Sequence, residues 1–191
     1  GTATFATYTG DVDVTTVRVS DGDFLDIEID ALTDKTATFL AESASVTGVG
    51  GTFTGASATT TADFTVNGGA TQSLDLNGIA DNAAAYAAAL NGQMTGMKVT
   101  VATGQLVLET DRLGSSATFT LSNDGGDFAT LTGLTIATTT STPANNNVAD
   151  SEAVTFAEIK TRIEADIITA TPADILVVTQ DADDDYLVLT A

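Results

Sequence analysis

Apolar and polar residues alternate with a period of two over most of the chain, which is the pattern of strands that bury one face. The first such stretch flanks the turn sequence Ser20-Asp21-Gly22-Asp23. Its apolar positions are Val12, Val14, Val17, Val19, Leu25, Ile27 and Ile29. Because an Asp-Gly step tolerates positive φ in a tight connection, this pattern predicts a β-hairpin over residues 12–30.

A second hairpin is predicted where Phe64-Thr65-Val66 is followed by Asn67-Gly68-Gly69 and then by Leu74-Asp75-Leu76. The two hairpin segments look like copies of one another. Two more strands are predicted at residues 97–101 and 105–110, joined by Ala102-Thr103-Gly104, and a further strand at residues 117–121.

A helix is predicted over residues 83–90, because this alanine-rich run has high helix propensity and Asp81 or Asn82 can cap its free amides. We expect Gly92 to end it. Ile79, Tyr86 and Leu90 fall on one stripe, which would face a sheet while the alanines permit close approach.

The strongest helix signal lies near the C-terminal end of the sequence. Thr155 and Glu158 have the spacing of a capping box. Apolar residues then recur with helical spacing at Phe156, Ile159, Ile163 and Ile167, and the i,i+4 pairs Glu158–Arg162 and Lys160–Glu164 are expected to form. Pro172 should end this segment, and residues 175–179 and 186–190 should form a hairpin around Asp181–Asp185.

Together these elements predict an α+β fold, mainly antiparallel β with two helices, built from two similar hairpin-helix-hairpin units. We expect one unit to be inserted in the other. Residues 12–35 plus 150–191 would form the outer unit, and residues 60–142 the inserted one, with crossings at residues 41–62 and 138–150. A linear string of independent hairpins is the alternative.

Composition narrows the classes of function. The chain has 191 residues, 43% of them apolar, and a net charge of −20, which argues against nucleic acid and anionic membrane surfaces as partners. It has no His and no Cys, which excludes zinc-finger sites, Cys nucleophiles and His-based triads. The longest apolar run, Ala83–Leu90, is far shorter than the roughly 20 residues of a membrane span, so a soluble chain is expected. Because it begins with Gly1, we interpret it as a fragment or a processed product.

None of the acidic motifs predicts a metal-binding site. Asp181, Asp183 and Asp185 match the first positions of a calcium loop, but Tyr186 stands where glycine is needed and the last ligand would fall beyond Ala191. A solvated hairpin tip is the better interpretation, and the same holds for the acidic groups at Asp21, Asp23 and Asp26 and at Asp124 and Asp127.

Two further motifs have ordinary explanations. Gly48-Val49-Gly50-Gly51 lacks the lysine and hydroxyl residue of a phosphate loop, so a flexible crossover is expected there. The basic residues are scattered and should neutralise nearby acids: Arg18, Lys35, Lys98, Arg112, Lys160 and Arg162. Glycoside hydrolysis by paired carboxylates is disfavoured because the chain has no Trp for a sugar-stacking cleft. We therefore expect no enzyme, no cofactor, and no catalytic, cofactor-binding or metal-ligating residues.

The sequence resembles a module that recurs in contractile tail sheath proteins of bacteriophages. The likeness rests on FTVNGGATQSLDLNGIADNAAAYAAALNG, MKVTVATGQLVLETDRLGSSATFTLS and FATLTGLT within residues 60–136, and more loosely on VRVSDGDFLDIEID, TFAEIKTRIEADI and YLVLTA. The resemblance implies a protruding domain of a sheath subunit in the virion, assembled in the bacterial host cytoplasm. Its partners would be neighbouring sheath subunits in hexameric rings and the tail tube, with the fragment itself monomeric.

Two alternatives stay open. The same pattern is similar to repeats in the variable regions of flagellins and hook-associated proteins, which would imply an exposed filament domain. A surface carbohydrate-binding module is the other alternative, with Tyr8, Tyr86 and Tyr186 as candidate aromatic contacts. Tyr86 is also explained as a core residue of its helix.

Overall fold

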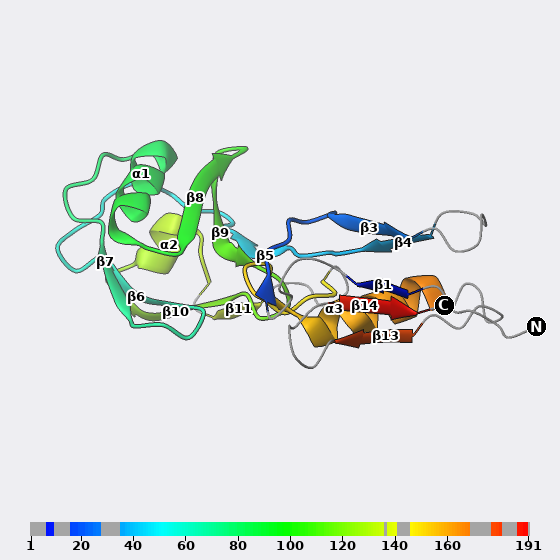
Figure 1. Cartoon of the computed structure of the whole chain (residues 1–191). Helices are drawn as coiled ribbons and strands as arrows, with labels where there is room; N and C mark the ends of the chain where they lie inside the picture. The colour runs from blue at the N-terminus through cyan, green and yellow to red at the C-terminus, as the bar shows by residue number, and fades with distance from the viewer. Residues whose placement is uncertain are drawn as a thin grey trace, which may run out of the picture. The chain divides into compact units, whose positions relative to one another are not determined.

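The computed structural model describes residues 7–9, 16–27, 35–135, 137–140, 146–168, 177–180 and 187–190. The chain divides into two compact units (Figure 1). Unit 1 comprises Gly1–Ala41 and Pro143–Ala191, and unit 2 comprises Glu42–Thr142 between them. The fold is α+β and mainly antiparallel β, as predicted.

Unit 2 contains two antiparallel sheets that share one hydrophobic core. The four-stranded sheet has the order β11 (Thr138–Thr140), β10 (Thr118–Gly125), β6 (Thr61–Val66), β7 (Gln72–Asp75). The three-stranded sheet has the order β5 (Ser43–Thr47), β9 (Gln105–Leu113), β8 (Met97–Ala102). Burial alternates along β6 and β9, so each sheet contributes one face to the core.

The two hairpins predicted in unit 2 are confirmed. β6 pairs with β7 across Asn67 and Gly68, whose φ angles are 50° and 69°. β8 pairs with β9 across Thr103 and Gly104, with φ of 50° and 77°. Positive φ at both central residues is the type I′ arrangement, whose twist matches that of the flanking strands.

Helix α1 (Ala83–Gln93) also follows the prediction, with two refinements. The Asn82 side chain caps it by accepting a hydrogen bond from the Ala85 N–H at 2.8 Å, whereas Asp81 accepts one from Gly55. The helix continues one residue past Gly92. Tyr86 and Leu90 are fully buried, which confirms the interpretation of Tyr86 as a helix core residue.

The crossing expected at residues 41–62 is instead part of unit 2. β5 pairs with β9, and residues 49–53 hydrogen-bond to the segment that contains the short helix α2 (Phe128–Thr132), which was not predicted. The expected flexible crossover at Gly48–Gly51 is wrong. A Cβ on Gly48 would lie 2.6 Å from the Thr132 carbonyl oxygen, and one on Gly51 would lie 2.7 Å from the Thr132 carbonyl carbon. Glycine is therefore needed here for backbone-to-backbone contact.

In the part of unit 1 that the structure describes there are three small sheets. The first has the order β1 (Thr7–Thr9), β14 (Leu187–Thr190), β13 (Val177–Gln180). In the others, β2 (Thr16–Val17) pairs with β12 (Val154–Thr155), and β3 (Phe24–Ile27) pairs with β4 (Lys35–Thr38). The C-terminal hairpin is confirmed, while Pro172 and Asp181–Tyr186 lie outside the described residues.

The hairpin predicted over residues 12–30 is wrong. The turn at its centre does form, because the Asp23 N–H donates to the Ser20 carbonyl at 3.1 Å. However, Val17 pairs with Val154, and Phe24 pairs with Thr38. The partner of β2 lies more than a hundred residues away along the chain, and a local turn signal carries no information about it.

Helix α3 (Phe156–Ile163) begins with the predicted capping box and continues as a π-helical turn over Glu164–Ile168. Ile159, Ile163 and Ile167 are buried as expected. Lys160 pairs with Glu164 at 2.6 Å. The expected Glu158–Arg162 pair is replaced, because Arg162 pairs with Asp166 and the Glu158 carboxylate accepts from Thr155 and Ala149.

Candidate functional site

Most of the acidic side chains around the predicted turns accept hydrogen bonds from backbone amides or hydroxyl groups. Asp21 accepts from the Ala41 N–H at 3.0 Å, and Asp23 from the Ser20 N–H at 2.7 Å. Asp26 accepts from the Thr36 hydroxyl at 2.6 Å. In the second group, the Asp124 carboxylate accepts a hydrogen bond from the Ala129 N–H at 3.2 Å, whereas Asp127 is the N-cap residue of α2 but its side chain makes no capping hydrogen bond.

Metal and ion-pair chemistry can be assessed for the described part of the chain. Within it, no three His, Cys, Asp or Glu residues are grouped so that they could hold a metal ion. Three of the basic residues form ion pairs with acids, as expected. Arg18 pairs with Glu152, Lys160 with Glu164, and Arg162 with Asp166. Among the described residues, no helix combines the length and apolar character needed to cross a membrane.

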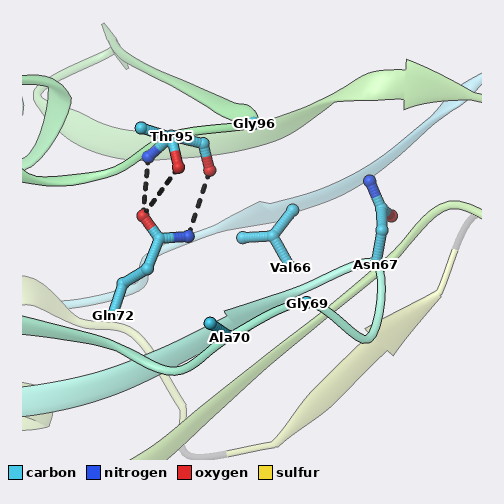
Figure 2. Close-up of a pocket in the computed structure, with 7 residues that line it drawn as sticks. All are labelled: Val66, Asn67, Gly69, Ala70, Gln72, Thr95 and Gly96. Carbon is cyan, nitrogen blue, oxygen red and sulfur yellow. Dashed lines mark hydrogen bonds between the residues drawn. The ribbon is translucent and has the colours of Figure 1, made fainter.

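Unit 2 has a pocket of about 290 Å³ beside the β6–β7 turn. Figure 2 shows its lining residues: Val66, Asn67, Gly69, Ala70, Gln72, Thr95 and Gly96. All of these side chains are uncharged at neutral pH. The pocket therefore has no group that could act as a general acid or base.

Its polar wall is formed by the Gln72 amide, which bonds to the backbone of Thr95 as a neighbouring strand would (Figure 2). Gln72 Nε2 donates to the Thr95 carbonyl at 3.1 Å, and the Thr95 N–H donates to Gln72 Oε1 at 2.7 Å. The Thr95 hydroxyl donates to the same oxygen at 3.1 Å. These polar groups are thus already used within the protein rather than left for a ligand.

Two more side-chain amides near the end of α1 make the same kind of bridge. Gln93 accepts from the Asp75 N–H at 2.7 Å and donates to the Asp75 carbonyl at 2.8 Å. Asn91 accepts from the Val99 N–H at 2.8 Å and donates to the Val99 carbonyl at 2.7 Å. α1 is therefore tied by side chains to the strands on either side of it, β7 and β8. No sequence pattern indicated these bridges, because each joins residues whose proximity depends on the fold.

Asp63 is a surface carboxylate with a well-defined set of partners. Asn123 donates to one of its oxygens at 2.9 Å and Ser73 to the other at 2.8 Å. These hydrogen bonds hold the pKa of Asp63 below its usual value. Because the three residues lie on the neighbouring strands β7, β6 and β10, the cluster links one face of the sheet and has no feature of a catalytic acid.

Tyr86 is fully buried, including its hydroxyl group. Burial, and then the negative charge of Asp81, raise the pKa of its hydroxyl. The nearby Ala56 backbone opposes that shift, but the hydroxyl makes no hydrogen bond of normal geometry within the described residues. The ring packs edge-on against Phe53 at a centroid distance of 5.6 Å. A buried Tyr86 cannot contact a carbohydrate at the surface, and Tyr186 and the Tyr8 side chain lie outside the described residues.

Comparison with known proteins gives no match: no family model fits the chain, and no curated protein or solved structure is similar to it.

Proposed function

We propose that this chain is a structural body, the protruding domain of a bacteriophage contractile tail sheath subunit. Two lines of support come together. The sequence resembles the sheath module, and the polar side chains that would serve a binding or catalytic site are instead used to join backbone segments. Such a domain works by holding its shape on the outside of a larger particle.

The observation that carries the proposal is the pairing of the two ends of the chain. β1 and β14 are antiparallel, with Thr7 opposite Thr190. The polypeptide thus enters and leaves unit 1 at adjacent points of one sheet. A domain with this geometry can be carried as an outgrowth of a larger subunit without disturbing the subunit's own fold.

In this proposal the partners are neighbouring sheath subunits and the tail tube, and the isolated domain is monomeric. The net charge of −20 gives like-charged domains on adjacent subunits a mutual repulsion that opposes lateral bundling of tails. Contraction would carry each unit as a rigid body, because each has its own buried core.

Immunogold electron microscopy tests the proposal directly. An antibody raised against the purified chain is applied to particles from a culture of the organism that encodes it, and antibody pre-absorbed with the chain is the control. We expect gold particles along the outside of tails, in both extended and contracted states. Label on flagellar filaments would favour the flagellar alternative, and label confined to tail fibres or baseplates would overturn the sheath assignment.

A further inference from the structure

Unit 2 contains three Asn-Gly sequences, a chemically labile step. They are Asn67-Gly68, Asn77-Gly78 and Asn91-Gly92. In such a step the backbone nitrogen of glycine can attack the asparagine side-chain carbonyl, because no Cβ on the following residue blocks its approach. The three sites share this local chemistry, so differences between them must come from the fold.

Two of these asparagines are held by hydrogen bonds. Asn91 lies within α1, and both ends of its amide bond to the Val99 backbone. Asn67 accepts from the Thr118 N–H at 2.9 Å through its side chain, and its own N–H donates to the Thr118 carbonyl at 2.8 Å. Attack at either site requires these bonds to open first.

The side chain of Asn77 has no such restraint, although its backbone N–H donates to the Asp75 carboxylate at 2.7 Å. It is exposed, and within the described residues its side chain makes no hydrogen bond. It lies in a turn closed by the Ile79 N–H donating to the Leu76 carbonyl at 3.2 Å, with φ of 72° at Gly78. That φ at the third position is typical of a type II turn, which leaves the Gly78 N–H outside the turn's own hydrogen bond. A Cβ at Gly78 would meet nothing within 4 Å, and the same holds at Gly68 and Gly92, so the sites differ in the hydrogen bonds of the asparagine side chain and not in the space around the glycine.

We propose that Asn77 is a site of spontaneous deamidation in the folded protein. The Gly78 backbone nitrogen loses its proton and bonds to Asn77 Cγ, the Cγ–Nδ2 bond breaks, and ammonia leaves. Water then opens the resulting succinimide at either carbonyl, giving aspartate or isoaspartate at position 77. The net reaction consumes one water and releases one ammonia, with no change in oxidation state.

The modification alters the connection between β7 and α1. A new carboxylate at position 77 stands beside Asp75, whose side chain accepts the Asn77 N–H at 2.7 Å. The isoaspartyl form also adds a backbone carbon between Leu76 and Ile79, both of which pack against the core. Unit 2 therefore acquires negative charge and a distorted turn as the protein ages.

Peptide mapping by mass spectrometry tests the proposal. The intact chain is incubated in mildly alkaline buffer, sampled over time and digested, and electron-based fragmentation separates isoaspartate from aspartate. We expect the peptide that contains Asn77 to gain about one dalton. The deamidation rate at Asn77 should exceed that at Asn91 by at least about tenfold, because two hydrogen bonds hold the Asn91 side chain.

Two controls make the comparison sharp. In guanidinium chloride all three sites should react at similar rates, which isolates the effect of the fold. The variant Asn77→Gln should show no mass gain in that peptide while circular dichroism confirms a native fold. Equal rates at Asn77 and Asn91 in the folded chain, or no reaction at Asn77 over a period in which the denatured chain deamidates, would overturn the proposal.

Discussion

The two units share part of their order of elements but are stabilised differently. In unit 2 the strand β5 is followed by the hairpin β6–β7, the helix α1 and the hairpin β8–β9, and β5 pairs with β9. Unit 1 has the strand β1, the hairpin β3–β4, the helix α3 and the hairpin β13–β14 in the same order, with the short strands β2 and β12 in addition, and β1 pairs with β14. Unit 2 is inserted after β4, before the helix of unit 1.

The helices that occupy the same place in this order differ most. α1 is rich in alanine, buries Tyr86 and Leu90, and is tied to backbone by Asn91 and Gln93. α3 depends on a capping box, on the ion pairs Lys160–Glu164 and Arg162–Asp166, and on a stripe of isoleucines. Neutral hydrogen bonds and close packing hold α1, whereas α3 uses charged groups in addition to its buried isoleucines.

The distribution of charge sharpens this contrast. Unit 1 holds 18 of the 26 acidic and four of the six basic residues, a net charge of −14, against −6 for unit 2. Units with a similar arrangement of strands and helix can therefore differ strongly in net charge. We expect unit 2 to be sensitive to changes in packing and unit 1 to changes in pH and ionic strength.

The largest effect is expected for Tyr86→Ala. Removing a fully buried aromatic ring leaves a cavity beside Phe53 and should destabilise unit 2 by about 3–5 kcal/mol. Hydrogen exchange read by mass spectrometry should lose protection in α1 and β8, while peptides from α3 keep theirs because unit 1 has its own buried residues.

Tyr86→Phe is the matched control. Because the hydroxyl has no hydrogen-bond partner within the described residues, its removal should be neutral or stabilising by up to about 1 kcal/mol in urea unfolding. A clear loss of stability in this variant would mean that the hydroxyl is satisfied in solution, for example by a buried water.

The next effect is expected for Gly51→Ala. The added Cβ would lie 2.7 Å from the Thr132 carbonyl carbon, so two backbone segments must separate, at a cost of about 2–3 kcal/mol. Gly92→Ala is the control, because that helical glycine has open space around its Cβ position and alanine should stabilise α1 by roughly 0.5–1 kcal/mol. Urea midpoints that move in the same direction for both variants would contradict the close-contact interpretation.

Local chemistry decided which parts of the fold could be predicted. Asn67-Gly68, Thr103-Gly104 and the Thr155–Glu158 box each specify a structure within a few residues, and all three are found. Pairing between distant segments, as in β2 with β12, depends on the whole fold, so the turn near Gly22 misled the prediction. The role of Gly51 was misjudged for the same reason, because its partner α2 lies about 80 residues further on.

In unit 1 the capping carboxylate should respond to pH. Burial tends to raise the pKa of Glu158, but hydrogen bonds from the Thr155 hydroxyl, the Thr155 N–H and the Ala149 N–H outweigh it, and the pKa is lowered. A lowered folded-state pKa means that the stabilisation is present above the ordinary glutamate pKa of 4.5 and is lost as pH falls through the folded-state value.

Glu158→Gln isolates this contribution. At neutral pH the free energy of unfolding of unit 1 should be about 1 kcal/mol lower in the variant than in the original chain, because a neutral amide oxygen replaces the charged acceptor. In urea titrations followed by hydrogen exchange, the gap between the two proteins should close as pH falls below 4.5. A gap that stays constant with pH would assign the difference to packing instead of charge.

The smallest effect is expected from salt, and its sign tests which charge interaction dominates unit 1. Within the described residues its ion pairs are Arg18–Glu152, Lys160–Glu164 and Arg162–Asp166, which are partly or largely exposed, so each contributes at most about 1 kcal/mol and is screened by salt. Salt also screens the mutual repulsion of a net charge of −14, which acts over the whole unit. Because excess acids outnumber paired ones, added sodium chloride should raise the midpoint of unit 1 by a few degrees and change unit 2 less. A lower midpoint for unit 1 would mean that the three ion pairs outweigh the repulsion.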